Sequence, residues 1–148
     1  MKKPNKITVR RISKGELYLV KALDQLIFGS VGCDAEPEEY DESDWWLAYN
    51  GKPPIAFAGS VTNHKDYVQL QRSGILPEYR GHGLQKRLIR ARVSYSKAKG
   101  AKTVYTYCAS WNSPSINSLI SCGFKVYRPE INYGSEGDIY LIKQLEKS

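Results

Sequence analysis

Residues 75–85 of the chain are Ile75-Leu76-Pro77-Glu78-Tyr79-Arg80-Gly81-His82-Gly83-Leu84-Gln85, a stretch that links a predicted strand to a predicted helix. The strand covers residues 66–76 and ends at Pro77, which cannot donate to a strand ladder. Gly81 and Gly83 predict a tight turn with exposed backbone amides. The helix that follows runs through Lys99 and adds its own unpaired N–H groups at its start. This arrangement favours binding of a phosphate or a pyrophosphate.

The turn differs from the two common phosphate-binding fingerprints. The dinucleotide-binding pattern requires a third glycine three residues after Gly83, where the chain has Lys86. A Walker loop ends in Gly-Lys-Ser/Thr, and the sequence contains no such run. Taken alone, the turn is therefore equally consistent with an ordinary strand-to-helix connection.

Length and composition are typical of a globular domain. The 148 residues, of which 41% are hydrophobic and 25% charged, predict a single domain over residues 1–148. No run approaches the about 20 apolar residues of a membrane span, and no signal-like core follows the N-terminal lysines. Cys33, Cys108 and Cys122 are widely spaced and lack metal-ligand spacing. We therefore expect reduced thiols, a cytoplasmic location, no metal and no membrane partner.

Charge is distributed unevenly along the chain, whose formal net charge is +7. Seven of the eleven residues from Asp34 to Asp44 are acidic, and no Lys or Arg occurs between Lys21 and Lys52. A basic body with one acidic segment indicates either two partners of opposite charge or one partner and a segment that shields the body itself.

The spacing of apolar residues predicts an α/β fold with a mixed, mostly antiparallel central sheet. A hairpin is expected at Asn50-Gly51, and a helical crossover joins two parallel strands at the centre. A last helix is predicted with Ser113 as its cap and Pro114 at its first position. The predicted strands cover residues 7–12, 45–49, 54–61, 66–76, 103–108, 124–127 and 138–142, and the predicted helices cover 17–28, 36–40, 84–99 and 114–122.

Two motifs, at this spacing, resemble those of the GCN5-related N-acetyltransferase (GNAT) family. The stretch from Ile75 to Leu84 resembles the acyl-CoA-binding motif, in which an Arg/Gln-x-x-Gly-x-Gly/Ala run cradles the pyrophosphate of coenzyme A. Asn112, followed by Ser115, Ile116 and Gly123-Phe124, is similar to the second motif of the family. The resemblance covers almost the whole chain and implies that the two parallel strands part in a V at the crossover.

The resemblance also implies how acetyl-CoA is held. Backbone groups of Ile75 and Leu76 would pair with the pantetheine arm, amides of residues 80–85 would take the pyrophosphate, and Asn112 would reach the pantetheine. Cationic side chains such as Arg87 are further candidates for the phosphates. The implied coenzyme-binding residues are Ile75, Leu76, Arg80, Gly81, His82, Gly83, Leu84, Gln85, Lys86, Asn112 and Ser115.

The chain departs from the family pattern at the residues that carry protons. Gln85 stands where the motif has Gly or Ala, and Leu119 stands where family members carry a tyrosine that protonates the leaving thiolate. Ser118, next to Leu119, is a candidate for that role. Tyr107 occupies the place of a glutamate base found in relatives that acetylate protein N-termini. Tyr107 and Ser118 are therefore the catalytic candidates, and the other candidate bases are His64, Asp66 and the acids of residues 34–44.

The acidic segment is the candidate acceptor site, because carboxylates attract a cation. Its candidate residues are Glu38, Glu39, Tyr40, Asp41 and Trp45. We expect direct attack of a primary amine on acetyl-CoA, without an acyl-enzyme. The acceptor would be a cationic small molecule, or a lysine or N-terminus of a protein, and the enzyme a monomer or a homodimer.

Two other functions remain open from the sequence. The missing tyrosine favours a regulator of the same fold that binds acetyl-CoA without catalysis. The net charge and the eleven tyrosines favour a nucleic-acid-binding module, although no strand carries a stripe of basic and aromatic residues.

Overall fold

The computed structural model describes residues 6–29 and 37–145 of the chain. The strands are β1 (Thr8–Arg11), β2 (Asp44–Tyr49), β3 (Pro54–His64), β4 (Tyr67–Ile75), β5 (Thr103–Ala109), β6 (Lys125–Val126) and β7 (Asp138–Gln144). The helices are α1 (Leu17–Phe28), α2 (Pro37–Glu42), α3 (Leu84–Ala98) and α4 (Ser113–Ser121), with 3₁₀ turns η1 (Lys14–Glu16) and η3 (Pro77–Tyr79).

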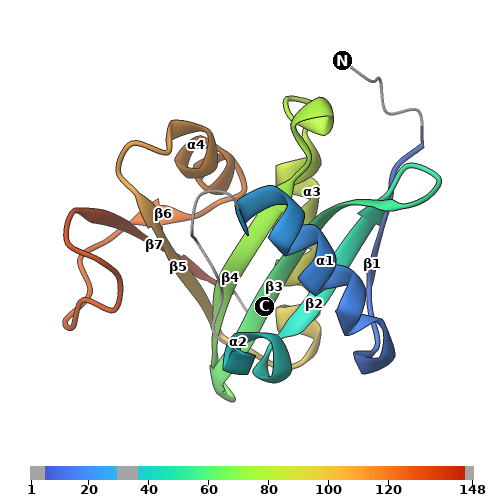
Figure 1. Cartoon of the computed structure of the whole chain (residues 1–148). Helices are drawn as coiled ribbons and strands as arrows, with labels where there is room; N and C mark the ends of the chain where they lie inside the picture. Colours follow the sequence, from blue (N-terminus) through green and yellow to red (C-terminus); the bar gives the residue numbers. More distant parts are fainter. Residues whose placement is uncertain (1–5, 30–36, 146–148) are drawn as a thin grey trace.

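The strands form one seven-stranded sheet in the order β1-β2-β3-β4-β5-β7-β6 (Figure 1). Neighbouring strands are antiparallel, except for β4 and β5, which are parallel and joined through α3. The predicted mixed, mostly antiparallel α/β fold with a central crossover is confirmed.

The parallel strands β4 and β5 separate after a short paired segment, as the V-shaped split requires. Their ladder ends at the pair Gln69–Tyr105. One residue further on, the hydroxyl of Thr106 donates to the carbonyl of Leu70 over 3.2 Å, in place of a backbone bond. Figure 1 shows the two strands close together near the β3–β4 turn and apart at their other ends.

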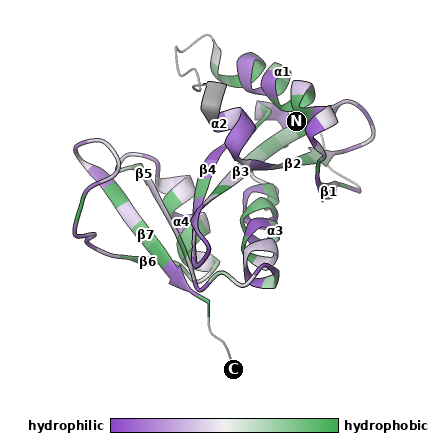
Figure 2. Cartoon of the chain, turned by 90° about the horizontal axis from the view of Figure 1, so that it is seen from below, coloured by the Kyte–Doolittle hydropathy of each residue, from purple (hydrophilic) through white to green (hydrophobic). Residues whose placement is uncertain are grey.

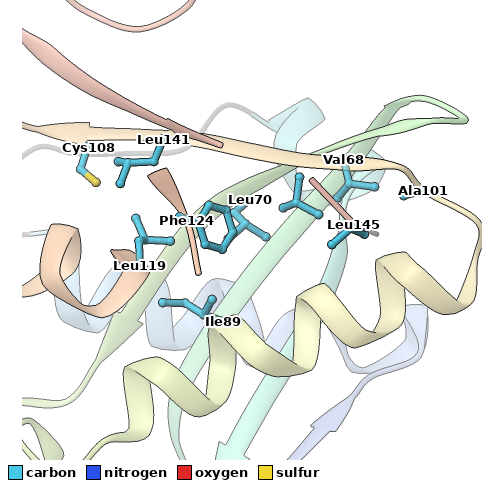
Figure 3. Packing of buried hydrophobic residues seen from close by; sticks show 10 residues of the cluster. Val68, Leu70, Ile89, Ala101, Cys108, Leu119, Phe124, Leu141 and Leu145 are labelled. Atoms are coloured by element: carbon cyan, nitrogen blue, oxygen red, sulfur yellow. The ribbon is translucent and has the colours of Figure 1, made fainter. Parts of the chain in front are cut away.

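Helices cover both faces of the sheet: α1 and α2 lie on one side, α3 and α4 on the other (Figure 2). Beneath α1, the core contains Val20, Leu47 and Phe57, all fully buried. On the other face, Figure 3 shows Phe124 among side chains from β4, α3 and α4. The residues nearest to it in that cluster include Leu70, Ile89 and Leu119.

The buried face of α3 includes polar residues that the apolar pattern alone did not predict. We expected Leu84, Leu88, Ala91, Tyr95 and Ala98 to face the core. Leu84 and Leu88 are buried, and Ala91 and Tyr95 pack partly buried against the same core cluster, as expected, whereas Ala98 is exposed. The other buried residues of α3 are Ile89, Arg92 and Ser96. The Ser96 hydroxyl is satisfied by the Arg92 carbonyl at 2.8 Å. The core face therefore follows steps of four residues from Leu84, and Arg92 lies on it.

Two local predictions are wrong in detail. The cap of α4 is Asn112 rather than Ser113, because the Asn112 side chain accepts the backbone N–H of Ser115 over 3.3 Å. The strand β3 continues to His64, which pairs with Tyr67, whereas the predicted strand ended at residue 61, so the turn to β4 is confined to Lys65 and Asp66.

We expect Gly59→Ala to lower the free energy of unfolding by ~1–3 kcal/mol, the usual cost of overpacking. A Cβ atom at Gly59 would lie 2.6 Å from the ring of Trp45. That ring packs between Tyr40 and Phe57, at centroid distances of 5.8 and 6.0 Å, and is 3% exposed, so it has little room to move. Urea unfolding measures the change.

Gly15→Ala is the matched control, because the nearest atom to a Cβ there is 3.8 Å away. Its unfolding midpoint should stay close to that of the unmodified protein. Equal midpoints for the two variants would contradict the close packing of Trp45 on Gly59.

Candidate functional site

A cleft of about 300 Å³ lies where β4 and β5 separate. Residues of β4, β5, α3 and α4 form its walls, and Glu39 of α2 lies at its edge. Both faces of the sheet therefore contribute to one site, because the parted strands leave a passage between them. Its lining includes Arg72 and Ser73 of β4, Tyr107 and Cys108 of β5, and Arg92 of α3.

Strand β4 carries a β-bulge at the cleft. Ser73 is opposite Ala58 and Gln71 is opposite Gly59, so Arg72 is an extra residue in the ladder. Two consecutive side chains then lie on the face of α1 and α2. Gln71 donates to the Ser43 hydroxyl, just after α2, at 2.7 Å, and Arg72 reaches α1.

Arg72 forms a paired contact with Asp24 of α1 that sequence analysis missed. Nε and Nη2 of Arg72 donate to the two carboxylate oxygens of Asp24 over 2.7 and 2.9 Å. The Tyr40 hydroxyl donates to the same carboxylate at 2.9 Å. The side chain of Asp24 is 3% exposed and that of Arg72 is 18% exposed. A signal exists in the sequence, because Asp24 falls on the apolar stripe of α1 between Val20 and Ile27.

Past the bulge, the backbone of β4 turns N–H groups toward the cleft. Leu76 donates to the Ile55 carbonyl at 3.0 Å. In an antiparallel ladder the adjacent residue, Ile75, then points its N–H away from β3 and toward the opening. The Ile75 carbonyl accepts Nε of Arg80 at 2.9 Å, which holds Arg80 beside the end of the strand.

The glycine turn has the open geometry that the sequence predicted for it. Gly81 and Gly83 have φ values of +84° and +79°, and a Cβ at either position would have no atom within 4 Å. No side chain caps α3, and its first ladder bond runs from the Arg87 N–H to the Gly83 carbonyl. The N–H groups of residues 84–86 therefore have no partner within the helix. The arrangement suits an anion.

On the α4 side, two predicted residues meet at the wall of the cleft. Nε2 of Gln85 donates to the Ser115 hydroxyl over 3.3 Å. Asn112 also lines the cleft and uses its side-chain oxygen to cap α4. Gln85, at the position where the motif has Gly or Ala, thus connects the first turns of α3 and α4.

Ser118, a catalytic candidate, and Trp45, a candidate acceptor residue, lie away from the cleft. Ser118 does not line it, whereas Leu119, 4% exposed, does. Trp45 is in the core on the α1 side, where its indole N–H donates to the Tyr40 carbonyl at 3.0 Å. The alternation of β2 turns Trp45 inward, so the structure gives it a packing role and not contact with an acceptor in this cleft.

Of the predicted acceptor residues, the structure brings Glu39 to the cleft. Tyr40 is engaged with Asp24, and burial raises the pKa of its phenol to about 12. Asp41 is exposed on α2. The side chain of Glu38 and the acids at positions 34 and 36 lie outside the described residues.

Tyr107 lines the cleft and is 40% exposed. Its ring packs on Tyr133 and Tyr140, with centroid distances of 5.7 and 6.2 Å. Burial, followed by the charges of Asp138 and Glu39, raises the pKa of its phenol above the usual value. The phenol is therefore protonated at neutral pH, so Tyr107 can donate a hydrogen bond and is poorly suited to the role of base. His64 and Asp66, the other candidate bases, lie at the β3–β4 turn and do not line the cleft.

Within the part of the chain that the structure describes, no three or more His, Cys, Asp or Glu side chains are grouped to hold a metal ion. None of the described helices is long and apolar enough to span a bilayer. Cys108 and Cys122 are free thiols, and burial raises the pKa of Cys108. Cys33 lies outside the described residues.

Comparison with known proteins agrees with this geometry. Residues 16–124 match the model of the family described as "Acetyltransferase (GNAT) family". A mycothiol acetyltransferase of Corynebacterium glutamicum is 26% identical over 94 residues, which are 64% of this chain and 32% of that protein. The chain thus spans about a third of the length of the curated relatives it matches.

Solved structures share the fold across nearly the whole chain. An IAA acetyltransferase from Bacillus cereus superposes with a TM-score of 0.76 at 16% identity, over 95% of this chain and 100% of that chain. An acetyltransferase of Bacillus subtilis, solved in complex with CoA, has a TM-score of 0.72 at 16% identity, with the same coverage.

Proposed function

The chain belongs to the GNAT family of acetyltransferases, and from this premise we propose that it transfers an acetyl group from acetyl-CoA to the primary amine of a cationic acceptor. The observation that carries the proposal is the cleft between β4 and β5, which Gln85, two residues after Gly83 of the open glycine turn, lines together with Glu39.

Coenzyme A fits the residues on the turn side of the cleft. The space above Gly81 and Gly83 is open, the start of α3 has no side-chain cap, and the Ile75 N–H points toward the opening. The solved relative from Bacillus subtilis contains CoA, which supports the assignment. When bound, the coenzyme supplies the acetyl group as a thioester. The residues proposed to hold it are the backbone of Ile75, Leu76 and Arg80–Gln85, with the side chains of Arg80, Lys86, Asn112 and Ser115.

The acceptor side of the cleft is suited to a cation. Glu39 is the one carboxylate that lines the cleft among the described residues. Of the two arginines in the lining, Arg72 is paired with Asp24, and the guanidinium of the buried Arg92 is held by backbone carbonyls. An ammonium group is therefore attracted to this edge. A lysine-like amine with a pKa of about 10.4 must lose its proton before attack, at a cost of ~4–5 kcal/mol at pH 7. We propose that the proton leaves to water at the open edge of the cleft.

Tyr107 is the proposed proton donor in the cleft. Oη carries its proton at neutral pH and can share it in a hydrogen bond with the leaving thiolate, and burial, which raises the pKa of the phenol, weakens it as an acid. Leu119 has no such group, and Ser118 does not line the cleft. The sequence made Tyr107 a candidate base, and we propose instead that it donates to the leaving group.

A second function, coenzyme binding without catalysis, is favoured by Leu119. It presents an apolar, 4% exposed side chain to the cleft where many family members are expected to carry a hydroxyl. Such a regulator would bind acetyl-CoA as tightly as an enzyme and release no thiol.

Two further proposals concern the cellular compartment and the domain. The two described cysteines are free thiols, which persist in a reducing compartment and support a cytoplasmic enzyme. We propose that residues 1–148 act as one acetyltransferase domain.

Free-thiol release from acetyl-CoA tests the proposal. The panel of amines contains polyamines, aminoglycosides, amino acids and basic peptides, and calorimetry with CoA is run first. Heat of binding together with thiol release in the presence of a cationic amine supports the enzyme. Binding without release from any amine favours the regulator, and no heat of binding overturns both.

We expect Glu39→Gln to raise KM for a cationic amine roughly fivefold, because a partly exposed charge pair contributes ~1 kcal/mol. The affinity for CoA should stay unchanged, since Glu39 lies away from the glycine turn. Steady-state kinetics with the amine found in the panel measures the change. Asp41→Asn removes an exposed charge from the same helix and is the matched control. Equal KM values for both variants would remove Glu39 from acceptor binding.

A further inference from the structure

Arg92, in the middle of α3, is buried beneath the cleft with 2% of its surface exposed. We propose that Arg92 is a positioning residue that holds the bulge of β4 in place and thereby directs Arg72 to Asp24 on the opposite face of the sheet. The consequence for catalysis rests on the proposed function, whereas the structural part of the inference stands without it.

The guanidinium of Arg92 bonds to both strands at the bulge. Nη1 donates to the Gly59 carbonyl at 3.0 Å and to the Gln71 carbonyl at 3.2 Å. These two residues form the ladder pair next to the extra residue, Arg72. Nε is held by the Leu88 carbonyl at 3.0 Å, which fixes the side chain on its own helix. One side chain therefore fixes β3, β4 and α3 relative to one another.

Arg92 is held by carbonyl groups and not by an acid. Within residues 6–29 and 37–145, it forms no ion pair with a carboxylate. Burial lowers the pKa of its guanidinium to about 9, so it is still charged at neutral pH. A buried charge is costly, and here its compensation comes from backbone dipoles of the bulge. A side chain that only filled space at this position would need neither the charge nor the donors of the guanidinium.

The bulge reverses which face the side chains of β4 point to. Before it, Val68 and Leu70 lie in the cluster with Ile89 of α3. After it, Ile75 lies in the cluster with Leu84 of α3, although it is an odd number of residues further on. If β4 paired with β3 without a bulge, strict alternation would turn Ile75 to the α1 face and Arg72 into the core beneath α3.

Loss of the Arg92 guanidinium leaves the two carbonyls without their donor. The strand can then regain a regular ladder by removing the bulge, and Arg72 no longer reaches Asp24. Arg92 and Asp24 lie on opposite sides of the sheet, with α3 on one and α1 on the other (Figure 2), and no hydrogen bond or ion pair joins them. We expect energetic coupling between them to pass through the bulge, and Arg92→Lys, which keeps the charge, separates this route from a direct charge–charge interaction.

A double-mutant cycle on unfolding therefore tests the inference. The variants are Arg92→Met, Asp24→Asn and the pair of them, with Arg90→Met, an exposed arginine of the same helix, as the control in the same cycle. We expect the effect of Asp24→Asn on the unfolding equilibrium constant to shrink ~10-fold in the Arg92→Met background, because additivity fails for coupled residues. With Arg90→Met the effects should add.

Additive effects of Arg92→Met and Asp24→Asn would overturn the inference, because a merely packed side chain on the far face gives additivity. If Arg92→Met does not fold, Arg92→Lys enters the same cycle. It keeps the charge and reaches fewer carbonyls, so a coupling of roughly threefold is expected and additivity overturns the inference again.

Catalysis supplies a separate readout. If the chain acetylates the amine of the panel, Arg92→Met should lower kcat about tenfold, since a small shift of groups at the cleft is costly. CoA affinity should change little, because the glycine turn is intact, and Arg92→Lys should restore part of kcat. If no thiol is released by the unmodified protein, the proposed function fails while the unfolding cycle still decides the role of Arg92.

Discussion

Gly83→Val is expected to weaken CoA binding ~30-fold, equivalent to about 2 kcal/mol, while leaving the fold in place. Gly83 has a φ of +79° and no atom within 4 Å of a built Cβ, so the valine side chain would stand in the open space above the turn. A β-branched residue also resists positive φ, so the turn would shift its amides away from their present directions. Isothermal calorimetry with CoA measures the loss.

Gly100→Val separates this effect from backbone strain. Gly100 follows the other end of α3, has a φ of +93° and likewise has no atom within 4 Å of a built Cβ. Its replacement should strain the backbone as much as Gly83→Val does and leave CoA binding within about twofold, since the glycine turn is untouched. Equal loss of binding in both variants would mean that the turn at Gly83 does not contact the coenzyme.

The parts of the site predictable from sequence are those set by local chemistry. Gly81 and Gly83 adopt positive φ because glycine alone tolerates it at little cost, and Pro77 ends β4 because it has no N–H. Asn50-Gly51 likewise predicted the β2–β3 hairpin, with Gly51 at φ +89°. None of these depends on a distant partner, so the sequence pattern was sufficient.

The bulge of β4 was not predictable, because it depends on register with β3. The polar run from Gln69 to Ser73 contains no apolar residue other than Leu70, so alternation gives no sign of the extra residue. The same is true of Trp45, whose burial follows from pairing with Gly59. The burial of Arg92 was predictable in part, because it lies four residues after Leu88 on the apolar stripe of α3.

Arg72→Met is expected to lower the free energy of unfolding by ~3–5 kcal/mol, the usual cost of leaving one partner of a buried ion pair uncompensated. Asp24 would keep the Tyr40 hydroxyl as a donor and lose both bonds from Arg72, 48 positions away in the chain. With a side chain 3% exposed, Asp24 cannot recover hydration without moving α1 away from the sheet. Urea unfolding at neutral pH measures the loss.

The double variant Asp24→Asn with Arg72→Met distinguishes a loss of stability caused by charge from one caused by packing. Asparagine keeps an oxygen for the Tyr40 hydroxyl and removes the stranded charge, so we expect at least half of the lost stability to return. If the double variant is no more stable than Arg72→Met alone, the contribution of Arg72 is its packing on Phe28, over whose ring it lies at 5.0 Å. In either case, Tyr40 connects the Asp24–Arg72 pair to α2, which also carries Glu39. We therefore expect Arg72→Met to shift Glu39 and to change KM for a cationic amine more than it changes the affinity for CoA.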